Sequence, residues 1–109
     1  MIRTTTADHT FTLPFEYEKY VANFEISYKQ DGVVLLRKNK SGIESGAVEV
    51  VGNDICVHLK PNETKLFKAG YAQAQIRILT PNGKEVPSEE IDIFVGEVLD
   101  EEGGFNDEI

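Results

Sequence analysis

The sequence of 109 residues contains a single cysteine, no tryptophan and only two histidines. Cys56 has no partner for an intramolecular disulfide, which excludes a disulfide-stapled fold and favours a reducing compartment over export. A structural zinc site takes four ligands, and Cys56 and His58, two residues apart, supply only two. We therefore expect neither a metal nor any other cofactor.

Long apolar runs and basic charge are also scarce. No stretch approaches the roughly 20 apolar residues of a membrane-spanning helix, and residues 1–6 lack the apolar centre of a signal peptide. Six of the 19 acids lie in residues 97–109, which leaves 13 acids against 11 bases in residues 1–96. Non-specific nucleic-acid binding requires a basic stripe. The sequence therefore predicts a soluble protein that binds neither membrane nor nucleic acid.

The groups needed for catalysis are few. A nucleophile must lie near a histidine that a third group orients. His58 occupies a polar position of an alternating segment, which is typical of a sheet surface, and His9 precedes the first predicted strand, where we expect a capping or turn role. Glu89, Glu90 and Asp92 are typical of a solvated face. We predict that the chain is not an enzyme and has no small-molecule substrate.

What the sequence does have is apolar residues at every second position in most segments, with turn residues between the segments. This period is that of β-strands with one buried face. Asp31-Gly32 and Gly52-Asn53 separate neighbouring segments and predict hairpin turns. The predicted strands are residues 10–15, 24–29, 33–38, 48–51, 55–60, 71–80 and 91–95, the last with a possible continuation through Val98-Leu99.

Two segments depart from this period. Residues 38–46 are polar with two glycines, so we expect a loop. Pro61 opens a polar turn and Gly70 follows it, which predicts a short helical turn between strands. The segment 71–80 is the longest predicted strand, so we expect it at the centre of a sheet.

About seven short strands, spaced by roughly ten residues, are typical of an immunoglobulin-like sandwich. We therefore predict an all-β fold, an immunoglobulin-like antiparallel β-sandwich over residues 1–99, with a small Greek-key barrel as the alternative. After Leu99 the sequence changes abruptly to acids and glycine, which bury too little to offset their ordering entropy. Residues 100–109 are predicted to form a disordered, flexible acidic tail.

Two groups of apolar side chains are candidate partner contacts. Phe15, Tyr17 and Tyr20 lie within six residues, where they either form a contact patch or cover one end of the sandwich, which is the commoner case. Phe105 and Ile109 stand among glycine and acids, as in segments that order on docking to a partner. A plain solvated terminus is the alternative for the second group.

The chain resembles small structural proteins of tailed phages and prophages of Gram-positive bacteria over most of residues 2–99. The resemblance rests on Thr10–Phe15, on Leu59–Thr64 with Phe67 and Gly70, on Gln75–Thr80 with Asn82–Lys84, and on Ser88, Ile91–Ile93 and Val98-Leu99. The middle segments are also similar to the N-terminal sandwich domain of phage baseplate upper proteins. The acidic extension after Leu99 departs from the family, whose members tend to end sooner.

This resemblance implies a virion component of the tail or baseplate, assembled in the cytoplasm of the bacterial host. It implies self-association, giving a homo-oligomer, or docking to other virion proteins, and it implies no catalytic residues. The exposed strand edges and loops would bind protein, because a free edge can be completed by another chain. A carbohydrate- or host-surface-binding module is the alternative, although the absence of tryptophan weakens it.

Overall fold

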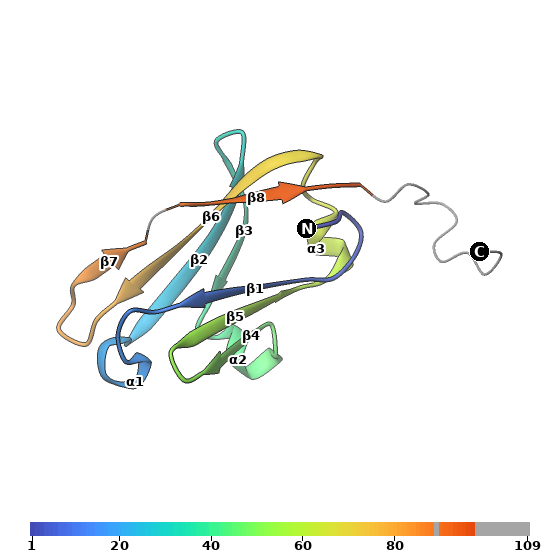
Figure 1. Ribbon diagram of the computed structural model, residues 1–109. Helices are drawn as coiled ribbons and strands as arrows, with labels where there is room; N and C mark the ends of the chain where they lie inside the picture. Colours follow the sequence, from blue (N-terminus) through green and yellow to red (C-terminus); the bar gives the residue numbers. More distant parts are fainter. Residues whose placement is uncertain (89, 98–109) are drawn as a thin grey trace.

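The computed structural model describes residues 1–88 and 90–97, in which eight strands form two antiparallel sheets that pack face to face (Figure 1). The smaller sheet has the order β1 (Ala7–Thr12), β5 (Asp54–Leu59) and β4 (Val48–Val51). The larger sheet has the order β3 (Val33–Asn39), β2 (Asn23–Gln30) and β6 (Gly70–Leu79), followed by β7 (Glu85–Pro87) and β8 (Ile91–Val95), which pair with successive parts of β6.

The order and connections of these strands are those of an immunoglobulin-like sandwich, as predicted. The smaller sheet matches strands B, E and D of a variable-type domain, and β3, β2, β6 and β7 with β8 match C′, C, F and G. Strand A, which would lie beside β1, has no counterpart there within residues 1–88 and 90–97. Residues 1–3 instead run beside the end of β8, where Ile2 forms a parallel bridge with Gly96.

The predicted alternation builds the core. Phe24, Ile26 and Tyr28 of β2 are buried, and the residues between them face outward. The same holds for Ile76 and Ile78 of β6, which pairs with β2 on one side and with β7 and β8 on the other. The predicted central position of this strand is therefore confirmed.

The first hairpin is closed by two residues with positive φ, Asp31 at 53° and Gly32 at 79°. This is the type I′ geometry that matches the twist of the flanking strands, and it favours glycine at the second position. The second predicted hairpin, β4 to β5, also forms, with Gly52 at a φ of 60°. Both predicted turns are confirmed.

The first strand was predicted too late in the sequence. It runs from Ala7 to Thr12, so His9 lies inside the strand and not in the cap or turn before it. The inward alternation of Phe11 extends back through His9 to Ala7, and these residues contact the core or the opposite sheet. Pro14 lacks the N–H needed to continue the ladder, which explains the earlier end.

Three short helices connect the strands. The predicted turn after Pro61 is α3 (Pro61–Thr64), whereas α1 (Tyr17–Tyr20) and α2 (Gly42–Ser45) were not predicted, the second lying inside the expected loop 38–46. Strand β7 was missed as well. None of the helices in the described part of the chain is long and apolar enough to cross a membrane. The predicted acidic tail, residues 100–109, lies outside the described residues.

Candidate functional site

The two lateral sides of the sandwich are built differently. On the side between β3 and β4 the chain crosses from one sheet to the other through residues 40–47, which include α2 and pack against β4. A Cβ atom added to Gly42 would lie 3.0 Å from Cγ2 of Val48, so the packing there is tight. On the side between β1 and β7, no element of the described chain crosses (Figure 1).

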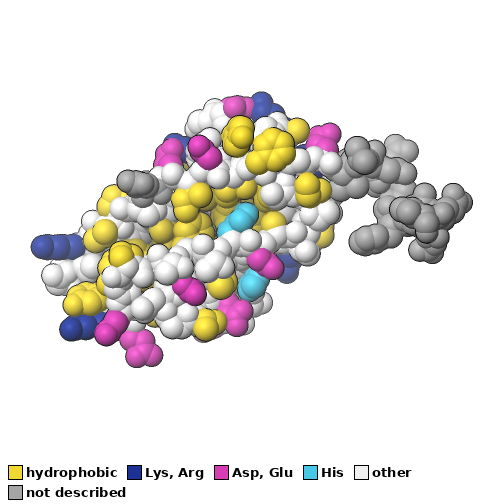
Figure 2. All heavy atoms as spheres, in the orientation of Figure 1, with side chains coloured by type: hydrophobic (Ala, Val, Ile, Leu, Met, Phe, Trp, Pro, Cys, Tyr) yellow, Lys and Arg dark blue, Asp and Glu magenta, His cyan; other side chains and the backbone are white. Residues whose placement is uncertain are grey.

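This open side holds an apolar groove of about 270 Å³. Its floor consists of core residues from both sheets, Phe11 and Leu13 on one side and Ile76 and Ile78 on the other. Hydrophobic side chains are visible in a hollow between the two sheets in Figure 2. Its walls are completed by Thr10, Thr12, Pro14, Phe15, Val86, Pro87, Ser88 and Ile91, so all the lining residues are uncharged.

Strand β1 presents a free backbone edge to the groove. Leu13 N–H donates to the Asn53 carbonyl at 2.9 Å, which fixes the phase of the ladder with β5. Because ladder bonds alternate along an antiparallel strand, the N–H and C=O groups of Asp8, Thr10 and Thr12 point away from β5. No other strand of the described residues pairs with this edge.

The N-terminus closes one end of the open side. The Met1 ammonium donates to the Phe94 carbonyl at 2.9 Å, and Arg3 N–H donates to the Gly96 carbonyl at 2.9 Å. Arg3 Nε also donates to the Phe67 carbonyl at 2.5 Å, which ties this end to the segment after α3. The opening is thereby confined to the stretch in which residues 10–15 face residues 86–88 and Ile91.

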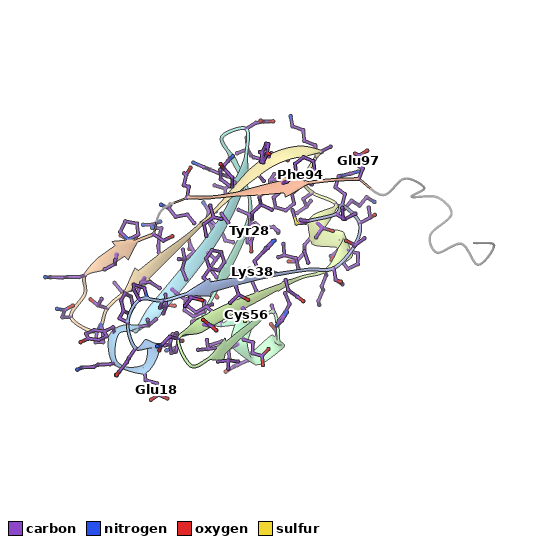
Figure 3. The ribbon with its side chains drawn as sticks, viewed as in Figure 1. Glu18, Tyr28, Lys38, Cys56, Phe94 and Glu97 are labelled. Carbon is purple, nitrogen blue, oxygen red and sulfur yellow. The ribbon has the colours of Figure 1, made fainter. Side chains whose placement is uncertain are left out.

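His9 and Tyr28 join the two sheets beside the groove. His9 Nδ1 lies 2.8 Å from the Tyr28 hydroxyl, and Tyr28 is fully buried between the sheets (Figure 3). Burial lowers the pKa of His9 and raises the pKa of Tyr28, with the charge of Glu63 adding to the second shift. Both side chains are therefore held neutral near pH 7, which suits a structural hydrogen bond.

On the closed side, a second polar pair lies between the sheets. Lys38 of β3 faces inward, opposite Ile26, and its ammonium pairs with the carboxylate of Glu63 in α3. Burial raises the pKa of Glu63, but hydrogen bonds from Lys38 and from the Lys60 backbone N–H outweigh it, so that the net shift is downward. Figure 3 shows Lys38 and Tyr28 in the space between the two sheets.

His58 lies on the outer surface of the smaller sheet, as predicted. Its Nδ1 is 2.7 Å from the Asp8 carboxylate and its Nε2 is 3.4 Å from that of Glu49, and these hydrogen bonds, the Asp8 bond foremost, raise the pKa of His58. Cys56 has a free thiol 3.4 Å from the Thr10 hydroxyl. Within residues 1–88 and 90–97, no cluster of three or more histidine, cysteine or carboxylate side chains is placed to hold a metal ion.

The structure separates the three aromatic residues predicted as a group. Phe15 lines the groove, and the ring of Tyr20 packs edge-on against it at a centroid distance of 5.7 Å. Tyr17 turns away and packs against Phe24 at 6.2 Å. Phe15 and Tyr17 also contact the core, as expected for residues that cover one end of the sandwich. Their contact with a partner stays a prediction, and Phe105 and Ile109 lie outside the described residues.

Sequence reasoning missed two exposed features. Ile91 faces inward, as the alternation in residues 91–95 predicts, yet it is 46 % exposed because no element of the described residues covers it. Tyr71 and Phe94 were not singled out, and they form an exposed edge-to-face pair on the outer face of the larger sheet, with ring centroids 5.5 Å apart. The signal for Phe94 was available, since it occupies an outward position of an alternating strand.

Neither a protein-family model nor a curated protein matches the sequence. Two solved structures are similar in fold. The V domain of amphioxus IgVJ-C2 is 12 % identical over 87 % of this chain and 96 % of that domain, with a TM-score of 0.36. Murine CRIg is 10 % identical over 90 % of this chain and 89 % of the other, with a TM-score of 0.40. The strand order and register described above define the immunoglobulin-like sandwich of this chain.

Proposed function

We propose that this protein is a non-enzymatic, protein-binding assembly module. The observation that supports this most is the free edge of β1 beside an uncharged apolar groove. Exposed strand edges can be extended by another chain, and natural proteins usually shorten, charge or cover them. Here Asp8, Thr10 and Thr12 present the edge, with one acid at its start and neither lysine nor proline among them. Such a surface suits a partner that covers it.

The dimensions of the groove favour a polypeptide over a small molecule. Sites for small ligands usually enclose about 300–1,000 Å³ and place a few polar groups to orient the ligand. This groove lies at the small end of that range, and its lining contains no charged residue. A few apolar side chains of an approaching protein fill such a space without the loss of hydrogen bonds that a polar ligand would suffer.

We place this module in the virion of a tailed phage or prophage, in the tail or baseplate, with other virion proteins or further copies of itself as partners. The support is the resemblance of most of residues 2–99 to small phage structural proteins. The open edge is compatible with that role, because virion assembly depends on repeated contacts between protein subunits.

Co-expression of the full chain with the products of its flanking genes tests the proposal. We expect tail or capsid genes among the neighbours and a stable complex with at least one of their products, measured by co-purification and light scattering. A chain that stays strictly monomeric and retains none of these proteins contradicts the proposal.

A carbohydrate- or host-surface-binding module is the second candidate, favoured by the exposed pair of Tyr71 and Phe94. Aromatic faces commonly contact sugars, but the two rings meet at 72° and do not form a flat platform. A glycan array with the full chain and with Phe94→Ala separates the two functions. Binding that the substitution abolishes supports the second candidate, and silence of the array removes it.

A further inference from the structure

We infer that the groove receives an extended strand from a different protein, which pairs with the edge of β1 and becomes the fourth strand of the smaller sheet. This rests on the proposed function and specifies its site and the chemistry of its partner. The position is the one that strand A occupies in a complete sandwich, and the described residues leave it unfilled.

The backbone of β1 offers the hydrogen bonds that such a strand needs. Asp8, Thr10 and Thr12 each direct an N–H and a C=O toward the open side. These residues alternate along the strand, which is the spacing at which a neighbouring strand presents its own groups. An added strand of about five or six residues would span the edge, at roughly 3.4 Å per residue.

The groove determines which side chains the strand carries. Alternate residues of the added strand would face inward, onto the floor formed by Ile76 and Ile78 and against the walls formed by Val86 and Ile91. All four are aliphatic, so a charged side chain buried among them would lack a counter-charge. The inward positions of the partner strand are therefore aliphatic, with β-branched residues favoured in a strand.

Charge argues for a partner other than the C-terminal segment of this chain. The strands that border the opening, β1, β7 and β8, carry Asp8, Glu85 and Asp92 and neither lysine nor arginine, although Asp8 bonds to His58 and Glu85 pairs with Arg77 on the outer face of the larger sheet. Acidic side chains are visible on both rims of the hollow in Figure 2. Residues 98–109 contain five acids and no base, so this segment would bring further negative charge to strands that already carry acids. The outward positions of the partner strand are accordingly basic or neutral.

A second copy of this chain is a poorer occupant. All its described strands already pair within its own two sheets. Edge-to-edge pairing of two β1 strands would satisfy the backbone but leave the groove empty, because the inward side chains of each β1 already pack in its own core. We therefore commit to a strand from another protein.

The test uses a displayed library of random twelve-residue peptides, selected on the full chain. We expect enriched peptides with aliphatic residues at alternate positions and lysine or arginine between them. Thr10→Pro removes an outward-facing N–H without removing a bond to β5, and Val86→Lys places a charge on the groove wall, where the valine is exposed. Each should weaken binding of a selected peptide at least about tenfold.

Matched substitutions separate binding from folding. Thr10→Val keeps the backbone N–H and a β-branched side chain, and Val33→Lys changes an exposed strand valine far from the groove. Both should bind the selected peptide as the natural chain does. Circular dichroism and thermal unfolding verify that all four variants are folded.

Amide hydrogen exchange measured by NMR distinguishes strand pairing from other modes of binding. The peptide should slow exchange at Asp8, Thr10 and Thr12, whose N–H groups point outward, and change little at His9 and Phe11, which already bond to β5. A peptide that merely fills the groove would not produce this alternation.

Failure takes distinct forms. The inference is wrong if no peptide is enriched, or if the enriched peptides are acidic. It is also wrong if the selected peptides bind Thr10→Pro and Val86→Lys as tightly as the natural chain. A dimer in light scattering, with the outward amides of β1 protected from hydrogen exchange without peptide, would also contradict it. If a virion protein co-purifies equally with the natural chain and with Val86→Lys, the proposed function stands and the groove is not its site. If peptides bind as expected but no virion protein does, the strand site stands and the virion role falls.

Discussion

The closed and open sides of this sandwich contain similar residues that differ in how far they are exposed to solvent. On the closed side, Val48 of β4 is 1 % exposed because the crossing chain, which includes α2, covers it. On the open side, Val86 of β7 is 42 % exposed although it lines the same interior space between the sheets. The difference shows that facing inward is not sufficient for burial, since an edge also needs a covering element.

The two sides also differ in the polar groups that lie between the sheets. The closed side contains the pair of Lys38 and Glu63, whose side chains are only 15 % and 17 % exposed. The open side contains His9, which is half-buried and bonds to Tyr28. Removal of one partner of the ion pair leaves a largely buried charge uncompensated, whereas removal of one partner of His9 and Tyr28 breaks a bond between neutral groups, so the loss should be larger on the closed side.

The largest contrast is expected from the two valines. Val48→Ala deletes two buried methyl groups where the surroundings are tightly packed, and should lower the free energy of unfolding by about 2 kcal/mol. Val86→Ala should lower it by less than about 0.5 kcal/mol, because the side chain is already partly in water. Urea titration followed by circular dichroism measures both. Equal losses would show that the two sides are packed alike.

The ion pair on the closed side comes next. Lys38→Met keeps the apolar stem but leaves Glu63 without its ammonium partner, and should cost about 1.5 kcal/mol at neutral pH. Because the folded pKa of Glu63 is lowered, the contribution is present above the ordinary value of 4.5 and lost as the pH falls through the folded value. A double-mutant cycle with Glu63→Gln isolates the pair, and a coupling energy near zero would contradict this account.

Two tyrosines provide a matched test of how much the hydrogen bond of a buried hydroxyl contributes to stability. Tyr28→Phe deletes the hydroxyl bonded to His9 and should cost about 1 kcal/mol. The Tyr17 hydroxyl is buried and has no hydrogen-bond partner in the described structure. Tyr17→Phe should therefore be neutral or slightly stabilising, because it removes an unsatisfied polar group. Thermal unfolding of both variants measures the two losses of stability. A larger loss for Tyr17→Phe than for Tyr28→Phe would show that the Tyr17 hydroxyl is the one that forms a stabilising hydrogen bond.

The smallest effect is the opposed pH dependence of the two histidines. The pKa of His9 is lowered, so its contribution to stability is full above about 6.5 and is lost as the pH falls below that value. The pKa of His58 is raised, so its contribution is full below about 6.5 and is lost as the pH rises through the folded value. His9→Gln should flatten the acid side of the stability profile and His58→Gln the alkaline side. Urea midpoints between pH 5 and 8 measure this, and NMR titration of the rings gives the shifts directly.

Much of the fold was predictable because it depends on local pattern. Alternation at Phe24, Ile26 and Tyr28 identified the buried face of β2, and Asp31-Gly32 identified the hairpin turn that follows. The start of β1 was harder, since His9 replaces an apolar residue in the inward series and its burial depends on Tyr28, 19 residues away. Strand β7 is three residues long, which is too short for a period to be recognised.

The sequence by itself determined most of the strands, the two hairpin turns after β2 and β4 and the buried face of strands such as β2 and β6, because alternation and turn residues act over a few neighbours. Only the tertiary structure decided which edges are covered. Residues 40–47 cross the closed side, whereas on the open side only the N-terminal residues pass from the end of β8 to β1, at one end, so Ile91, an inward-facing aliphatic residue, ends on the wall of a groove. The physical reason is that burial at an edge depends on contacts between segments far apart in the chain, which no local period encodes.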